Sequence, residues 1–420
     1  MSLQDTPRSN RLHIGIFGKR NSGKSSLINA LTNQSIAIVS DIAGTTTDPV
    51  YKSMEIHGIG PCVFIDTAGF DDTGAIGELR ISQTKKVMEK IDIAIMVFTH
   101  ETGGGSSDRG TSCLTLSHPY PIFEISDDEI EWIDELKRNK IKVISVINKI
   151  DIICNVEAIC KYIEDKCKIP VIPVSTITKE GIDEIREELI RSLPADYEND
   201  SITGSLVNES DIVLLVMPQD IQAPKGRLIL PQVQVIRELL DKKSIVVSVT
   251  TDKLDDALAS LKNPPKLIIT DSQVFKKVYE KKPEGTMLTS FSVLLAGYKG
   301  DLNYFAKSAH AIEHLTEDSK VLIAEACTHA PLSEDIGREK IPMMLRKRIG
   351  EGLRVDVASG TDFPDDVSDY DLIIHCGGCM FNRKYVLSRI EKARIAHVPM
   401  SNYGVVIAYL SGILDKIDMP

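Results

Sequence analysis

The chain has 420 residues, of which 42% are hydrophobic and 26% charged, a composition typical of a globular protein with several cores. Its formal net charge of −11 argues against nucleic acid as a partner, because phosphate contacts need clustered Lys and Arg. No uninterrupted apolar run approaches the roughly 20 residues of a membrane span, and the first residues lack a signal-peptide core. We therefore expect a cytoplasmic protein with no membrane partner, whose eight cysteines serve as thiols or metal ligands.

Apolar runs and helical patterns alternate in the first half of the chain, which predicts an α/β fold. The runs LHIGIFG, CVFIDTAG, IDIAIMVF and IKVISVINKID are typical of buried parallel strands. The pattern stops near residue 195, before a polar linker, so we assign residues 1–195 to one domain. Residues 100–122 are rich in Gly and Ser without periodicity, which predicts a flexible insertion.

The first predicted strand leads into a phosphate-binding pattern. Residues 18–25, GKRNSGKS, match G-x-x-x-x-G-K-[S/T], and the residues that follow have helical spacing. Gly18 and Gly23 let backbone N–H groups surround a β-phosphate, while Lys24 can reach the β- and γ-phosphates and Ser25 can bind Mg²⁺. The loop residues predicted to bind the nucleotide are Gly18, Asn21, Ser22, Gly23, Lys24, Ser25 and Ser26.

Three further motifs appear in the order expected of a GTP site. In Asp66-Thr-Ala-Gly69, Asp66 stands where a carboxylate of the Mg²⁺ shell belongs, and the Gly69 N–H can meet the γ-phosphate. The stretch NKID resembles the guanine-binding N-K-x-D motif, in which Asp151 accepts hydrogen bonds from guanine N1 and N2, whereas adenine offers a mismatched edge. With Ser175 in the sequence VST, the predicted base-binding residues are Asn148, Lys149, Asp151 and Ser175.

The segment DIAGTTTD, residues 41–48, resembles a switch I. Thr46 is the predicted Mg²⁺ ligand there, with Thr45 and Thr47 as rivals, so the predicted catalytic residues are Lys24, Thr46, Asp66 and Gly69. Phe70 stands where Ras-like proteins carry the glutamine that positions water, and an apolar side chain cannot orient the attacking water. We expect slow hydrolysis, or a substitute group among Asp71, Asp72 and Glu78.

Two smaller α/β blocks follow, which predict two Rossmann-like domains at 205–280 and 285–420. In the first block, DIVLLVMP, SIVVSV and KLIITDS are the predicted strands, and 232–240 and 254–261 the predicted helices. In the second block, KVLIAEAC, YDLIIHC and RIAHVPM are the predicted strands, and 300–316, 336–350 and 383–393 the predicted helices.

Soft metal ligands follow two of the last predicted strands. Cys327 and Cys376 each end an apolar run, and the carboxyl ends of parallel strands face one crevice, so these thiols can converge with Cys379. The pattern Cys-Gly-Gly-Cys is compatible with a redox dithiol, zinc or an iron–sulfur cluster, and the last two fit a third cysteine about equally. The other cysteines, Cys62, Cys154, Cys160 and Cys167, are predicted core or incidental thiols, and we assign no role to Cys113.

The combination of GKRNSGKSS, DIAGTTTDP and DTAGFDD with C-x-H and H-C-x-x-C resembles the [FeFe]-hydrogenase maturation GTPases of the HydF family, with a TrmE–Era-like G-domain. The phrases QDIQAPKGRLILPQ and SNYGVVIAYL extend the resemblance through nearly the whole chain outside 100–122. In the TrmE–Era group, an asparagine at the place of Asn21 coordinates K⁺. We favour K⁺ at Asn21 over a purely conformational role.

The resemblance implies a K⁺-responsive GTPase domain, a middle domain that forms a homodimer, and a last domain with a [4Fe–4S] cluster on Cys327, Cys376 and Cys379. His329 or His375 is the implied fourth ligand or a neighbour that orients one. The expected function is to carry a transient diiron precursor, made with two radical-SAM maturases, to apo-[FeFe]-hydrogenase. The alternative is a ribosome-assembly or tRNA-modification GTPase with a structural zinc site.

Overall fold

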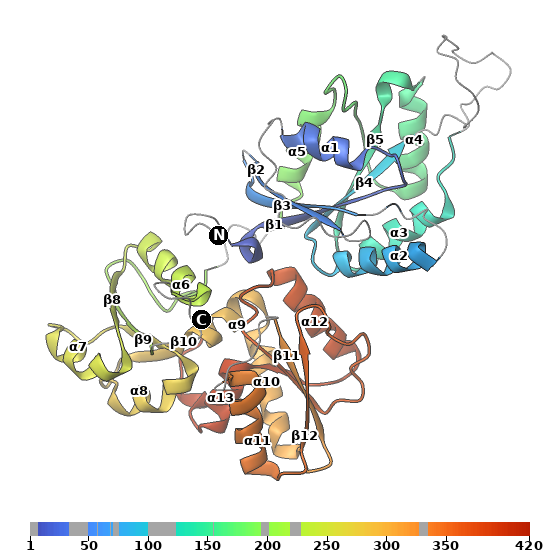
Figure 1. Cartoon of the computed structure of the whole chain (residues 1–420). Coiled ribbons are helices and arrows are strands. Elements are labelled where there is room, and N and C mark those ends of the chain that lie inside the picture. Colours follow the sequence, from blue (N-terminus) through green and yellow to red (C-terminus); the bar gives the residue numbers. More distant parts are fainter. Residues whose placement is uncertain are drawn as a thin grey trace. The chain divides into compact units, whose positions relative to one another are not determined.

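The computed structural model describes residues 7–32, 49–56, 58–67, 69, 75–99, 123–153, 155–194, 201–218, 228–326 and 335–420. The chain divides into two compact units, residues 1–197 and 198–420, and each is considered by itself (Figure 1). The switch I segment at 41–48, the insertion at 100–122, Phe70, Cys154, Cys327 and His329 lie outside the described residues. None of the helices in the described ranges is long and apolar enough to cross a bilayer.

The first unit is built on a six-stranded sheet with the order β2-β3-β1-β4-β5-β6. Its strands are β1 (Leu12–Phe17), β2 (Val50–Ile56), β3 (Gly60–Asp66), β4 (Ile93–Thr99), β5 (Lys142–Asn148) and β6 (Val171–Pro173). Its helices are α1 (Lys24–Thr32), α2 (Ala75–Met88), α3 (Asp127–Arg138), α4 (Val156–Cys167) and α5 (Ile182–Arg191). All strand pairs are parallel except β2 with β3, so the predicted parallel core is present with one antiparallel edge strand that the sequence pattern missed.

The central strands of this sheet are buried on both faces. Every residue of β4 except Thr99 is buried. One apolar core lies between the sheet and helices α1 and α5, and another lies between the sheet and helices α2, α3 and α4. Strands covered on both faces carry continuous apolar sequence instead of alternation, which is why IAIMVF was recognisable as a strand. The edge strand β2, VYKSMEI, is half polar and only partly buried, so it carried no such signal.

The second unit holds two four-stranded parallel sheets. The order in one is β10-β9-β7-β8, from β7 (Ile212–Val216), β8 (Ile245–Val249), β9 (Leu267–Thr270) and β10 (Met287–Ser290). The order in the other is β12-β11-β13-β14, from β11 (Lys320–Glu325), β12 (Arg354–Ser359), β13 (Leu372–His375) and β14 (Met400–Asn402). The helices are α6 (Leu230–Asp241), α7 (Leu254–Ser260), α8 (Phe275–Lys281), α9 (Phe291–Lys299), α10 (Leu302–Ala309), α11 (Ile341–Ile349), α12 (Arg383–Ile395) and α13 (Tyr403–Leu410).

The structure corrects one predicted strand and adds others. RIAHVPM was expected to be a strand, but α12 continues to Ile395, His397 takes a left-handed turn at φ 57°, and β14 begins only at Met400. The predicted last domain was to start at 285, whereas β10 at 287–290 pairs with β9 in the earlier sheet. The sequence pattern also missed β12. In RVDVAS the first four residues alternate between charged and apolar, and only Ala358 is buried.

Helix α9 joins the two sheets of the second unit (Figure 1). It contacts α6 on one side and α10, α12 and α13 on the other. Its buried Val293 and Ala296 belong to a single apolar core that contains Leu214 of β7 and Ile373 of β13. The two sheets therefore share one core, to which α9 contributes from between them.

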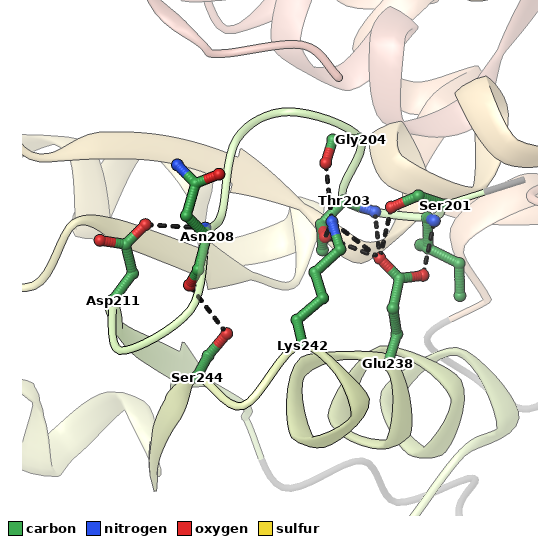
Figure 2. Close-up of polar contacts among 9 residues, drawn as sticks. Ser201, Thr203, Gly204, Asn208, Asp211, Glu238, Lys242 and Ser244 are labelled. Atoms are coloured by element: carbon green, nitrogen blue, oxygen red, sulfur yellow. Dashed lines mark hydrogen bonds and ion pairs between the residues drawn. The ribbon is translucent and has the colours of Figure 1, made fainter. Parts of the chain in front are cut away.

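The segment that enters the second unit is held on α6 by the half-buried carboxylate of Glu238 (Figure 2). Glu238 accepts hydrogen bonds from Ser201 Oγ at 2.8 Å, from the Ile202 and Thr203 backbone N–H groups at 2.5 and 2.9 Å, and from Thr203 Oγ1 at 2.7 Å. Lys242 Nζ lies 3.5 Å from the same carboxylate and donates to the Gly204 carbonyl. Burial alone would raise the pKa of Glu238, but the hydrogen bonds, those from Thr203 first, hold it below its ordinary value.

We expect Glu238→Gln to destabilise the second unit by about 1–3 kcal/mol, because an amide cannot accept all of these bonds and leaves buried N–H groups unpaired. A carboxyl whose pKa is lower in the folded state stabilises that state above the unfolded pKa, about 4.3 for Glu, and this contribution is lost as the pH falls through the folded pKa. Urea unfolding at pH 7 and at pH 3.5 measures both effects. The matched control is Glu209→Gln, an exposed carboxylate paired with Lys243. An equal loss in both variants at pH 7 contradicts the assignment.

Candidate nucleotide site and cysteine centre

The phosphate-binding loop lies between β1 and α1, at the carboxyl edge of the first sheet. Gly18 and Gly23 have φ of 148° and 91°, and a Cβ at Gly23 would lie 2.2 Å from Asn148 Nδ2, so both positions require glycine. Lys24 Nζ donates to the carbonyls of Gly18 and Lys19, at 2.9 and 2.8 Å, and is thereby held inside the loop. The buried Ser22 hydroxyl has no partner among the described residues. The backbone has the curved form that surrounds a phosphate.

Two of the three predicted magnesium ligands, Ser25 and Asp66, lie together, and the third, Thr46, lies outside the described residues. The Ser25 hydroxyl, in the first turn of α1, donates to the Asp66 carboxylate at the end of β3. Thr67 ties that strand end to β1 by donating through its N–H and its hydroxyl to the Ile16 carbonyl, at 3.3 and 2.6 Å. Hydroxyl and carboxylate oxygens are the donors that Mg²⁺ prefers, so this pair fits the ion. Gly69 is buried two residues beyond Thr67, and Ser26 is exposed on α1.

The predicted base-binding residues meet at the ends of β5 and β6. Asn148 is fully buried, and its Nδ2 donates to the Ser22 carbonyl at 3.0 Å. Lys149 takes φ of 65°, and its Nζ donates to the Asn21 carbonyl at 2.8 Å. Ser175 Oγ donates to Asp151 Oδ1 at 2.6 Å, which orients the carboxylate while leaving it exposed. Strands far apart in sequence thus bring the phosphate loop and the base-binding motif into direct contact.

Asn21 has a conformational role that the structure makes visible. It adopts φ of 59°, a left-handed conformation that Asn tolerates better than most residues, and its carbonyl accepts the Lys149 bond. Its side chain is exposed at the rim of the loop. The residue is therefore suited to the turn, and the K⁺ role of its side chain stays a prediction.

One contact of the phosphate loop was not predicted from the sequence. Lys19 Nζ lies 3.2 Å from the buried carboxylate of Glu129 in the first turn of α3. Glu129 also closes a capping box by accepting from the Ser126 N–H at 2.9 Å. The motif S-x-x-E before an apolar run predicts such a cap, but no sequence pattern connects it to the phosphate loop.

The cysteine loop follows β13 in the second unit. Cys376 N–H donates to the Ala324 carbonyl, and the Cys376 sulfur accepts from the N–H groups of Ala326 and Gly378, at 3.1 and 3.4 Å. Ala326 immediately precedes Cys327 in sequence. The ends of the adjacent parallel strands β11 and β13 therefore bring Ala326 against the Cys376 sulfur, whereas the predicted convergence of Cys327 itself lies outside the described residues. Burial, and secondly Cys379, raise the pKa of the metal-free Cys376 thiol to about 11.

His375 is completely engaged within the protein. Its Nδ1 pairs with the Cys376 carbonyl at 2.6 Å, and its Nε2 lies 3.0 Å from Arg389 Nη1. Because a carbonyl only accepts and a guanidinium only donates, Nδ1 carries the proton and Nε2 accepts. Burial, and then the Arg389 charge, lower the pKa of His375 to about 3, so the imidazole is neutral. In this geometry both ring nitrogens of His375 have partners within the protein.

Two buried cations surround the cysteine loop. Arg389 is 1% exposed and is stacked by the rings of Phe363, Phe381 and Tyr385, whose centroids lie 4.8, 4.5 and 4.7 Å from its guanidinium carbon. Lys299 is also 1% exposed, and burial lowers its pKa to about 8 while Cys379 and Cys376 act in the opposite direction. Among the described residues, no ion pair joins either cation to a carboxylate.

The described part of the cysteine centre fits an iron–sulfur cluster without completing one. No three His, Cys, Asp or Glu side chains among the described residues form a group able to hold a metal ion, and Cys327 and His329 lie outside those residues. What fits is the chemistry: two cysteines on a glycine loop, backbone N–H groups directed at a sulfur, and buried positive charge beside thiols that ligate iron as anions. The remaining described cysteines, Cys62, Cys160 and Cys167, lie in the first unit, where burial raises the pKa of each thiol.

Three family models match separate parts of the chain. Residues 13–149 match the model of a 50S ribosome-binding GTPase, residues 202–300 that of the hydrogen maturase F dimerization domain, and residues 303–419 that of the hydrogen maturase F tetramerization domain. The last two together cover just over half of the chain.

Curated relatives resemble the first half. GTPase Der of Wolinella succinogenes is 34% identical over 221 residues, and the tRNA modification GTPase MnmE of Clostridioides difficile is 31% identical over 220 residues. Each match covers 50% of this chain and 40% of the relative, so the chain spans about two fifths of the length of these relatives. Among solved structures, Aquifex aeolicus Era bound to GDP and aluminium fluoride is 18% identical, with a TM-score of 0.32 over 59% of this chain and 97% of Era.

We expect Asp151→Asn to reduce GTP affinity roughly ten- to a hundred-fold, because a hydrogen bond to a charged group is worth about 1.5–3 kcal/mol and the amide presents a donor to the guanine amino group. Xanthosine triphosphate, which has a carbonyl at that position, should bind the variant better than it binds the wild type. Competition binding with GTP, XTP and ATP measures both changes. Asp165→Asn, an exposed carboxylate on α4, is the control. Unchanged GTP affinity in Asp151→Asn would show that the base binds elsewhere.

Proposed function

The chain belongs to the hydrogen maturase F family, and on this premise we propose that it is a hydrogenase maturation GTPase that carries an iron–sulfur cluster and delivers a diiron precursor to apo-[FeFe]-hydrogenase. The first unit supplies a GTPase domain whose phosphate, magnesium and base-binding residues stand at one sheet edge. The second unit supplies the two maturase domains and the cysteine loop.

The observation that carries the cluster proposal is the 3.1 Å hydrogen bond from the Ala326 N–H to the Cys376 sulfur. It brings the residue before Cys327 against the first cysteine of the C-x-x-C loop. Cys327, Cys376 and Cys379 would hold the cluster, with Mg²⁺ at Ser25, Thr46 and Asp66 in the other unit. A [4Fe–4S] cluster on three thiolates leaves one iron with a replaceable ligand, which suits the transfer of an iron-containing cargo.

The hydrogen bonds of His375 reduce the number of candidate ligands for the fourth iron of the cluster. Because its Nε2 accepts from Arg389 and its Nδ1 donates to Cys376 O, binding iron would require the loss of a buried bond. We infer that His375 positions the loop and that the fourth ligand is His329, water or a carboxylate. A hydrogen bond to the backbone of a metal-binding residue commonly fixes the orientation of that ligand.

The dimerization and tetramerization domains support an oligomer, and we propose that the middle domain forms the homodimer. Two radical-SAM maturases and the apo-hydrogenase are the partners that this function requires. A ribosome-assembly or tRNA-modification GTPase with structural zinc is the competing proposal, supported by the resemblance of the first half to Der and MnmE. The maturase domains, which cover the second unit, favour the first proposal.

We expect anaerobically prepared protein to contain about four irons per chain and to give an EPR signal on reduction, as a [4Fe–4S] cluster does. Cys376→Ser should lose the signal and most of the iron, because a hydroxyl is a poor ligand for this soft site. Cys160→Ser, a partly buried thiol on α4, is the matched control and should keep both. Stoichiometric zinc without an EPR signal would instead support the competing proposal.

We expect GTP hydrolysis to be slow and several-fold faster in KCl than in NaCl, since a cation at Asn21 would stabilise the charge that develops on the phosphates. Asn21→Gly, which tolerates the left-handed backbone, should abolish the difference between the two salts at saturating GTP. Steady-state phosphate release at equal ionic strength measures this. Equal rates in both salts for the wild type would remove K⁺ from the mechanism.

A further inference from the structure

Lys299 is a buried lysine whose hydrogen-bond acceptors are backbone carbonyls of the cysteine loop. It is the last residue of α9, and its side chain is 1% exposed. Its Nζ donates to the carbonyls of Gly378, Cys379 and Phe381, at 3.2, 3.5 and 2.5 Å. An ammonium group has three donors, so these three carbonyls satisfy it completely.

The contact crosses from one family domain to the other. Lys299 lies in the part of the chain that matches the dimerization domain, at 202–300, and the cysteine loop lies in the part that matches the tetramerization domain, at 303–419. Two neighbouring contacts follow the same path: Arg383 Nε donates to the Tyr298 carbonyl at 3.2 Å, and Leu295 stands next to Gly377. The end of α9 therefore contacts the cysteine loop and holds it in place.

The charge of Lys299 is not balanced by a carboxylate. Among the described residues no ion pair involves it, and the acidic groups that act on it electrostatically are the thiols Cys379 and Cys376. Burying an ammonium ion costs several kcal/mol unless an anion or several acceptors compensate it. The three carbonyls satisfy the hydrogen bonds of the ammonium group, and thiolates bound to iron would supply the anionic partner that balances its charge.

We propose that Lys299 is a positioning residue for the iron–sulfur cluster: it ties the cysteine loop to the dimerization domain and keeps a positive charge beside the cluster thiolates. This inference rests on the proposed cluster at Cys376 and Cys379. A fixed positive charge near a cluster stabilises its reduced, more negative state and so raises its reduction potential. A change in the packing of α9 would reach the loop through the same side chain.

The test combines the charge-removing variants Lys299→Gln and Lys299→Met with the charge-retaining Lys299→Arg. The control is Lys307→Gln, an exposed lysine on α10. In reconstituted full-length protein, EPR-monitored redox titration should give a lower potential and faster iron loss to a chelator for the Gln and Met variants. Lys299→Arg should restore most of the wild-type potential. A wild-type potential in both Gln and Met variants overturns the charge role.

Cluster-free protein gives an independent measurement. Hydrogen exchange in the peptide 376–382 should become several-fold faster in Lys299→Met than in the wild type or Lys307→Gln, because the loop loses its anchor. Unchanged exchange overturns the anchoring role. If the wild type takes up no cluster, the proposed function fails, whereas the exchange experiment still decides whether Lys299 holds the loop. If Lys299→Met does not fold, Lys299→Gln, which keeps a donor for the carbonyls, carries the comparison of potentials.

Discussion

Parallel strands deliver their carboxyl ends to a single edge of a sheet, and both candidate sites of this protein depend on that constraint. In the first unit, β1, β3 and β5 end in the phosphate loop, Asp66 and Asn148. In the second unit, β11 and β13 end beside the cysteine loop. Side chains separated by more than a hundred residues can therefore meet, because the strand ladder fixes their positions before any ligand is present.

The two sites use backbone groups differently because their ligands differ. The nucleotide site offers N–H groups and a lysine around a space suited to phosphate. In the structure its residues bond to one another: Lys24 donates to the Gly18 carbonyl, and Ser25 donates to the Asp66 carboxylate. The cysteine centre turns its carbonyls inward to Lys299 and His375 and directs N–H groups at sulfur. The second arrangement is held by the buried side chains of Lys299 and His375.

The buried cations Arg389 and Lys299 explain how the C-x-x-C loop is held in place. Arg389 would be costly in a core without its three aromatic rings, the His375 nitrogen and the Gly360 carbonyl. Burial first, and then the charge of Arg389, keep His375 neutral, and the imidazole connects Arg389 to the loop backbone. Lys299 holds the other side of the loop from α9, the helix whose core is shared by both sheets.

The amino-acid sequence alone determined the α/β class, the nucleotide motifs and the cysteine pair, because each depends on short spacings that local chemistry makes recognisable. Buried strands such as IAIMVF were found by their apolar continuity, while the polar edge strands β2 and β12 were missed because half of their residues face solvent. Only the tertiary structure decided the hydrogen-bond partners of His375, the Lys19–Glu129 contact and the contacts of Lys299 with the cysteine loop. These depend on contacts between residues 14 to 110 positions apart, for which no local pattern exists. A histidine next to a cysteine looks like a ligand in sequence, whereas in the structure both of its ring nitrogens have partners within the protein.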